Sequence, residues 1–402
     1  MRIALLKPDF GVAGGFEAVA ARIEALLQAD GHQVTRLGVD MVPPRPQVVD
    51  LPIPRAVWDA APEYFTYLRG RDGFDQLDTR SFDAVISTQP PSFSHRHPRH
   101  LSVFYHHHRV YYDLEETYLE AGFAPDPEVH RRAGALIREL DQPRLEAVGW
   151  FLAGSDSVAG RLRMFNGVTN TSTFHAGLVA GGPRQGATAS GDETAPPGTG
   201  AVLSVGRHEF PKRTELAVAA AHLLPHLRFA LVGTGGREAW ARSLDYRLAT
   251  GTVDAERLDD LDLWCNTGAG TGPVPTGSKG TNVEFAGRVD DEDLALRYAK
   301  APCVVAPAFQ EDYGLTAVEA MAHGRPVVVC RDGGGLTELV EHERTGLVVE
   351  PTPVAIADAV DRLTREPDLA AELGRNAAHR AAELTWAAAA EELRAALDRV
   401  LA

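Results

Sequence analysis

Cysteine, long apolar runs and positive charge are all scarce in this sequence. Its 402 residues include 3 cysteines: Cys303 and Cys330 lie in apolar, strand-like runs, and Cys265 lies in a loop-like stretch. No cysteine spacing is typical of a disulfide framework or a metal site, so we expect a reducing cytoplasm. No run of about 18 apolar residues and no signal-peptide core occur, so we expect no stable membrane insertion. The formal net charge of −15 argues against a nucleic-acid partner.

The length and patterning of the chain predict two α/β domains. A chain of 402 residues that is 44% hydrophobic is long enough for two separate cores. Residues 181–200 are rich in Gly, Pro, Ser and Thr without periodicity, which is typical of a linker. Strand-like and helix-like segments alternate on both sides of it, which predicts a doubly wound parallel sheet in each domain. We therefore expect domains at 1–180 and 201–385, with a last helix from 386 to 402.

The first domain opens with a strand at 3–6, a Gly-rich turn and a helix at 16–29. Gly14 and Gly15 precede this helix, and a Gly-Gly pair there is a weak sign of a phosphate cradle. A tight turn that only connects strand and helix explains the pair equally well. Residues 52–80 are aromatic and charged without a strand pattern. They either line an acceptor site or cover a sheet edge, and we favour the sheet edge.

Three consecutive histidines, His106, His107 and His108, follow a predicted strand at 101–105. Side chains alternate along an extended backbone, so the three cannot all face one metal ion, and no nearby ligand set completes a zinc site. The carboxyl end of such a strand borders the ligand crevice of an open α/β sheet. We therefore expect one histidine to face a ligand.

Two carboxylates, Glu311 and Glu319, lie in a predicted strand, loop and helix between 303 and 322. Gly314, in the turn Tyr313-Gly314-Leu315, allows close approach of the backbone to a ligand, and the N–H groups of a helix start favour an anion or hydroxyl oxygens. This arrangement suits a ligand with a phosphate and vicinal hydroxyls. The alternative is that Thr316 and Glu319 form a capping box.

Two cations, Arg207 and Lys212, follow a predicted strand at 201–205. A planar guanidinium and a mobile ammonium form a suitable pair for a diphosphate. Scattered surface cations are the alternative on spacing alone. Residues 244–281 show no pattern that we can assign.

Several of these segments together resemble one enzyme family. The pattern PAxxExYGLxxxEAMAxGxPVV around Glu311 and Glu319, and the segment SVGRHEFPKRTELAVAA around Arg207 and Lys212, are similar to retaining glycosyltransferases of the GT-B fold, family 4. The resemblance implies two Rossmann-like domains facing each other across a cleft, with the last helix crossing back to the first domain. It also implies transfer of a hexosyl group from a nucleoside diphosphate sugar to a hydroxyl acceptor, with retention of configuration.

The resemblance also implies roles for single residues. Glu311 would bind the sugar hydroxyls and Glu319 the ribose hydroxyls, while His106, or alternatively His107, would contact the sugar. Arg207 and Lys212 would hold the diphosphate, together with the backbone N–H groups of Gly15 and Gly14. The remaining expected donor-binding residues are Arg288, beside the nucleobase, and Tyr313, Gly314 and Leu315. Glu338 is expected to be structural.

No cofactor and no metal is expected, because two cations occupy the place of a divalent ion. UDP or GDP is the expected donor nucleotide. A nucleotide-sugar epimerase or phosphorylase on the same fold is the alternative, and a non-catalytic scaffold is a third. The presence of all four charged site residues argues against the scaffold.

Overall fold

The computed structural model describes residues 1–11, 15–42, 53–178, 198–259, 263 and 281–402. The chain divides into an N-terminal unit, residues 1–176 with 386–402, and a C-terminal unit, residues 177–385. The boundary expected at residue 180 thus lies at Ala176, and the last helix belongs to the N-terminal unit.

The N-terminal unit is built on a six-stranded parallel sheet with the order β2-β1-β3-β4-β5-β6. Strand β1, the neighbour of the edge strand β2, is apolar from Ile3 to Leu6, and these residues are fully buried. The strand order reverses between β1 and β3. Strand β1 continues beyond the residues that pair with Ala84–Ser87. The strands are β1 Arg2–Asp9, β2 Gln33–Asp40, β3 Ala84–Ser87, β4 His100–Phe104, β5 Trp150–Ala153 and β6 Thr171–Thr173.

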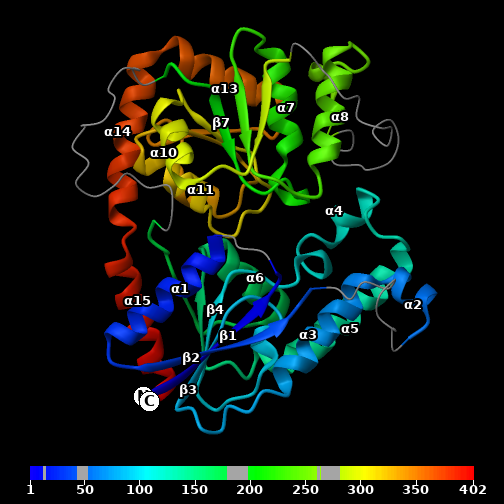
Figure 1. Ribbon diagram of the computed structural model, residues 1–402, viewed down its shortest axis with the longest axis vertical. Helices are drawn as coiled ribbons and strands as arrows, with labels where there is room; N and C mark the ends of the chain where they lie inside the picture. The colour runs from blue at the N-terminus through cyan, green and yellow to red at the C-terminus, as the bar shows by residue number, and fades with distance from the viewer. Residues whose placement is uncertain (12–14, 43–52, 179–197, 260–262, 264–280) are drawn as a thin grey trace. The chain divides into compact units, whose positions relative to one another are not determined.

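Helices cover both faces of this sheet, with α1 and α15 on one side and α3 and α5 on the other (Figure 1). Helix α15 packs against β4, β5 and β6, with Leu393 and Leu397 buried. The helices are α1 Gly15–Ala29, α2 Arg55–Ala60, α3 Pro62–Asp75, α4 Glu115–Glu120, α5 Pro127–Leu145, α6 Asp156–Asn166 and α15 Trp386–Leu401, with short 3₁₀ turns η1 Ser92–Ser94 and η2 Arg109–Tyr111.

Helices α2 and α3 occupy the aromatic stretch for which the sequence showed no strand pattern. Helix α3 buries Tyr67 and Phe74 and packs on β2, the edge strand of the sheet. The approach is close: a Cβ added at Gly73 would lie 2.7 Å from Val39 of β2. Covering the sheet edge is therefore the observed role of this helix.

The C-terminal unit has its own six-stranded parallel sheet, with the order β12-β11-β10-β7-β8-β9. The strand order reverses between β7 and β10, because the chain leaves β7 toward one edge and returns from β9 to the other side of β7. The strands are β7 Val202–Val205, β8 Phe229–Val232, β9 Val283–Gly287, β10 Val304–Ala306, β11 Val327–Cys330 and β12 Gly346–Val349.

Helices α7 and α8 lie on one side of this second sheet, and α10, α11 and α14 lie on the other (Figure 1). Helix α10 begins where the Asp290 side chain accepts from the Asp293 N–H at 2.8 Å, and acidic residues fill its first turn, as the helix dipole favours. The helices are α7 Thr214–Leu223, α8 Glu238–Ala249, α10 Asp291–Lys300, α11 Leu315–Ala322, α12 Leu336–Leu339, α13 Pro353–Arg365 and α14 Pro367–Glu383, with 3₁₀ turns η3 Phe210–Lys212 and η4 Ala255–Arg257.

The expected doubly wound α/β class is confirmed in both units, and each predicted strand named above is present within a few residues. None of the helices in the described ranges is long and apolar enough to cross a membrane. Cys303 and Cys330 are buried at β10 and β11, whereas Cys265 lies outside the described residues.

Candidate functional site

Three neighbouring loops of the C-terminal unit carry most of the candidate residues. They follow β7, β10 and β11 and comprise residues 206–213, 307–314 and 331–335. The first two border the point where the strand order reverses, between β7 and β10. Ligands of open α/β sheets bind at the carboxyl ends of the strands at such a switch point. Lys212 and Glu311 lie on the two loops beside it.

Backbone hydrogen bonds join these loops to one another. The Phe309 N–H donates to the Pro211 carbonyl at 2.7 Å, which connects the loops after β7 and β10. The Glu311 N–H donates to the Gly333 carbonyl at 3.0 Å, and the Gly335 N–H donates to the Glu311 carbonyl at 2.8 Å. The last two bonds extend the pairing of β10 and β11 and fix the backbone of Glu311 from both sides.

Glycine is required where the loops meet. Gly334 has a φ of 59°, and a Cβ there would lie 2.8 Å from the Glu311 carbonyl oxygen. Any larger residue would push the two loops apart, and Glu311 would move with them.

Arg213 and Asp332 add a side-chain connection that the sequence analysis did not identify. The Arg213 guanidinium donates to both carboxylate oxygens of Asp332, at 2.9 and 2.6 Å, and lies 4.8 Å from the centroid of the Phe309 ring. Arg213 is buried and has a φ of 51°, which is unusual for a residue with a side chain. The two residues are 119 positions apart, and nothing local in the sequence marks them as partners.

Lys212 and Glu311 form an ion pair, in which the ammonium donates to a carboxylate oxygen of Glu311. Their side chains are 28% and 16% exposed, so both are partly accessible. The family resemblance implies that these two residues bind different parts of one ligand, and the structure brings their side chains together. Arg207 is exposed on the same loop as Lys212. The arrangement presents positive charge beside a carboxylate that accepts hydrogen bonds.

The capping-box interpretation of Glu319 is wrong. Helix α11 begins at Leu315, so Thr316 is already inside it, and Gly314 occupies the cap position with a φ of 107°. Among the described residues, no side chain caps this helix start. Gly314 is also needed for space, since a Cβ there would lie 2.6 Å from the Leu336 side chain. The N–H groups at the start of α11 therefore do not have Glu319 as their partner.

Glu319 instead accepts a hydrogen bond from the Tyr298 hydroxyl of α10, at 3.0 Å. Burial raises the pKa of Glu319 from its ordinary value of 4.5 to about 7; the Tyr298 hydrogen bond opposes this change, and the negative charge of Asp291 adds to it. A carboxylate that is held in a largely buried position with a raised pKa is typical of a functional site. No local sequence pattern points to Tyr298 as a partner of Glu319, because the two residues lie 21 positions apart.

The other donor-binding candidates differ in how accessible they are. Arg288 is exposed just after β9, and Leu315 is partly exposed at the start of α11. Tyr313 is only 3% exposed, which leaves its ring little surface for a ligand. Glu338 is exposed on the short helix α12.

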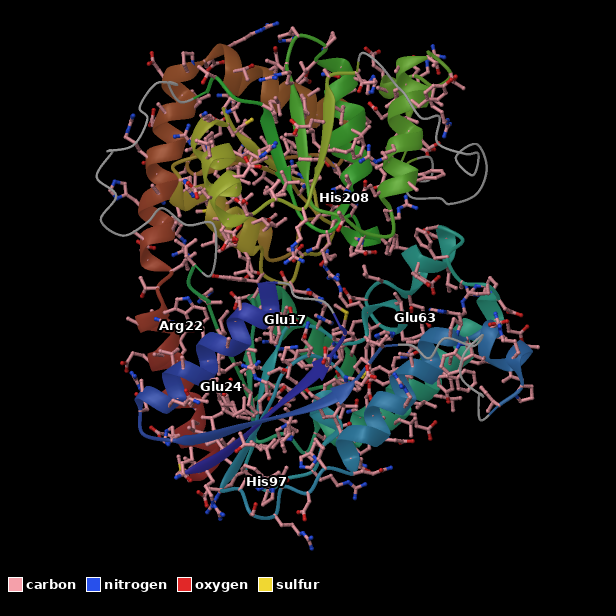
Figure 2. All side chains as sticks on the ribbon, viewed as in Figure 1. Glu17, Arg22, Glu24, Glu63, His97 and His208 are labelled. Carbon is pink, nitrogen blue, oxygen red and sulfur yellow. The ribbon has the colours of Figure 1, made fainter. Side chains whose placement is uncertain are left out.

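The three consecutive histidines, His106, His107 and His108, lie in three different environments. His106 follows β4, is partly buried, and its Nδ1 lies 2.7 Å from the His107 carbonyl. His107 is fully buried: its Nε2 lies 2.7 Å from the Asn166 side-chain oxygen, and its ring stacks on Tyr112. Burial lowers the pKa of His107 to about 4. His108 lies 3.4 Å from Glu63, which Figure 2 labels.

The alternative assignment of a ligand contact to His107 is therefore corrected: this side chain belongs to the core, and His106 remains the candidate. The described residues contain no group of three or more His, Cys, Asp or Glu arranged to hold a metal ion.

The glycine pair of the N-terminal unit is described in part. Gly15 is the exposed first residue of α1, whereas Gly14 lies outside the described residues. In the first turn of the same helix, Glu17, which is labelled in Figure 2, pairs with Lys7 of β1 at 3.1 Å. This ion pair joins β1 to the start of α1 and was not anticipated from the sequence.

The fold defined by these two units is that of GT-B glycosyltransferases. The structure is similar to sucrose-phosphate synthase from Thermosynechococcus elongatus, with a TM-score of 0.68 and 22% identity over 98% of this chain and 97% of that chain. It is also similar to HepE of Anabaena, solved in complex with UDP and glucose, with a TM-score of 0.61 and 17% identity over 99% of each chain. At these identities the likeness concerns the fold.

Sequence comparisons point to the same class. Residues 278–380 match the family model described as glycosyl transferases group 1, a segment that includes Glu311 and Glu319. The chain is 31% identical over 304 residues to D-inositol 3-phosphate glycosyltransferase of Pseudarthrobacter chlorophenolicus, which covers 71% of this chain and 63% of that protein. A D-inositol 3-phosphate glycosyltransferase of Nocardioides is 30% identical over 67% of this chain and 56% of that protein. The matches thus span less than two thirds of these curated relatives.

Proposed function

We propose that this protein is a retaining glycosyltransferase of family 4 that transfers a hexosyl group from a nucleoside diphosphate sugar to a hydroxyl acceptor. The observation that carries the proposal is the Lys212–Glu311 ion pair beside the switch point, together with Glu319 in α11, the helix that follows the loop of Glu311. The match of residues 278–380 to the glycosyltransferase model supports it.

The ion pair suits a ligand that carries both phosphates and hydroxyls. An ammonium group has three hydrogen-bond donors, so Lys212 can contact a phosphate oxygen while it still donates to Glu311. Lys212 also separates the negative charge of Glu311 from that of the diphosphate. The Glu311 carboxylate keeps further acceptor positions for sugar hydroxyls, and Glu319 accepts from the ribose hydroxyls.

The chemical step breaks the bond between the sugar C1 and the phosphate oxygen and forms a bond from C1 to the acceptor oxygen on the same face. The departing phosphate oxygen takes the proton of the acceptor hydroxyl, so no separate base is required. Negative charge grows on the diphosphate as it leaves, and Arg207 and Lys212 stabilise that charge. His106 and the Gly15 N–H are proposed to contact the sugar and the diphosphate, as the family resemblance implies.

The acceptor is proposed to be a small, hydroxyl-rich molecule. The relatives named for D-inositol 3-phosphate make inositol phosphate the first acceptor to assay. UDP and GDP sugars are the first donors. No feature of the described residues favours the epimerase or phosphorylase alternative.

A donor and acceptor panel tests the proposal. Thermal shifts with UDP, GDP, ADP and dTDP sugars identify the donor, because a ligand that binds the folded protein raises its melting temperature. Turnover with inositol 3-phosphate is then followed, and the anomeric configuration of the product is determined by NMR.

We expect one nucleotide sugar to stabilise the protein and the product to keep the donor configuration. Arg365→Ala is a matched control for a substitution of Lys212, because it also removes one cation. Arg365 is the last residue of α13, which begins at the carboxyl edge of the sheet and ends at the opposite edge, away from the loop of Lys212. Inversion of configuration, or binding of none of the nucleotides, would refute the proposal.

A further inference from the structure

Tyr298 joins helices α10 and α11 through its hydroxyl. That hydroxyl donates to a carboxylate oxygen of Glu319 at 3.0 Å and lies 3.4 Å from the Thr316 carbonyl. A phenol has one hydrogen to donate, and the carboxylate is both the closer and the more strongly accepting partner. The residue is fully buried, and its ring stacks on His323 with 5.4 Å between ring centroids.

We propose that Tyr298 is a positioning residue that holds one carboxylate oxygen of Glu319, so that the other oxygen is presented to the ribose hydroxyls of the nucleotide sugar. This proposal rests on the proposed function and adds a residue that lies behind the site. Tyr298 itself does not touch the ligand.

Packing makes the Tyr298 hydroxyl a suitable anchor. A glutamate side chain has three rotatable bonds, and fixing them on binding costs conformational entropy. The buried ring of Tyr298 cannot turn away, because it is enclosed and stacked on His323. Glu319 is therefore oriented before the nucleotide binds, which lowers the entropic cost of binding.

The same hydrogen bond favours the charged form of Glu319. A carboxylate accepts from two hydroxyls more strongly than a carboxylic acid does. Burial and the charge of Asp291 on α10 raise the pKa of Glu319, and the bond from Tyr298 counteracts them. Burial also raises the pKa of Tyr298 well above its ordinary value, so the phenol stays a donor over the working range of pH.

The test is Tyr298→Phe, which removes the hydroxyl and keeps the ring. Affinity for UDP-glucose and GDP-mannose is measured by calorimetry between pH 5.5 and 9, since neither diphosphate titrates in that range. Tyr246→Phe on α8, where the tyrosine is exposed, is the matched control.

We expect wild-type affinity to rise with pH through about 7, as Glu319 ionises. In Tyr298→Phe the midpoint should move to higher pH, and affinity at pH 7 should fall by about ten- to a hundredfold, as the loss of a hydrogen bond to a charged group implies. The donor KM should rise by a similar factor while kcat changes little. In a Glu319→Gln background, the Tyr298 substitution should have little further effect on binding.

A Tyr298→Phe protein with wild-type affinity and an unmoved midpoint would overturn the proposal, even if its melting temperature fell, because a purely structural tyrosine affects only stability. If the wild type binds neither probe nor any other nucleotide sugar, the proposed function fails and this proposal fails with it. The wild-type titration thus separates the two failures.

Discussion

Replacing Glu319 with glutamine tests the site through stability as well as binding. The pKa of Glu319 is about 7 in the folded protein, against an ordinary value of 4.5. Between these values the folded protein holds a proton that the unfolded chain has lost. The free energy of unfolding therefore falls as pH rises through this interval, and it is independent of this group below about 4.5 and above about 7.

The size of the effect follows from the interval. Each pKa unit corresponds to about 1.4 kcal/mol, so the full change from 4.5 to about 7 is an upper limit of roughly 3 kcal/mol. Glu319 is partly exposed, and solvent screening reduces the effect to about 1 to 2 kcal/mol. Glutamine keeps an oxygen that can accept from Tyr298 but cannot ionise. Glu319→Gln should therefore be more stable than the wild type at pH 8 by about this amount, and of similar stability at pH 5.

Binding should change in the opposite direction. A neutral amide accepts ribose hydroxyls more weakly than a carboxylate, and we expect a loss of about 1 to 3 kcal/mol in donor affinity at pH 8. A residue that lowers stability while it improves binding is typical of a functional site.

Thermal unfolding at pH 5 and pH 8 and calorimetry with the donor measure both effects. Glu292→Gln, on the exposed face of α10, is the control for loss of one carboxylate. A Glu319→Gln protein that is less stable than the wild type at pH 8, with unchanged donor affinity, would refute the reasoning and return Glu319 to a structural role.

Three further predictions concern the loops of the C-terminal unit. Lys212→Ala should weaken nucleoside diphosphate binding by about 1.5 to 3 kcal/mol, and wild-type affinity by calorimetry would contradict the diphosphate contact. Excess EDTA should leave turnover intact, because two cations serve the phosphates; loss of activity that Mg²⁺ or Mn²⁺ restores would count against this. Arg213→Ala and Arg213→Gly should both lower kcat/KM by releasing Asp332. Glycine should be the more stable of the two by about 1 kcal/mol in thermal unfolding, because φ is positive there, and equal stabilities would argue against that backbone strain.

The sequence alone predicted the fold class correctly, and it indicated where along the chain the candidate site residues lie. Short apolar runs such as Val304–Ala306 and Val327–Cys330 are strands buried on both faces, and their pattern is visible over a few residues. The position of Glu311 after one such strand and of Lys212 after another followed from the same local pattern. Because parallel strands end at one edge of a sheet, these residues could be expected near each other without knowledge of the contacts.

The tertiary structure decided which partner each side chain has. A Thr-x-x-Glu pattern fits a helix cap or a helix interior. The start of α11 at Leu315 shows that Glu319 does not cap the helix, and Tyr298 of α10 is its hydrogen-bond partner. The buried His107 is hydrogen-bonded to Asn166, and Asp332 is held by Arg213. These partners lie 21 to 119 positions apart, and the order of strands and the packing of helices bring them together, which no local pattern encodes.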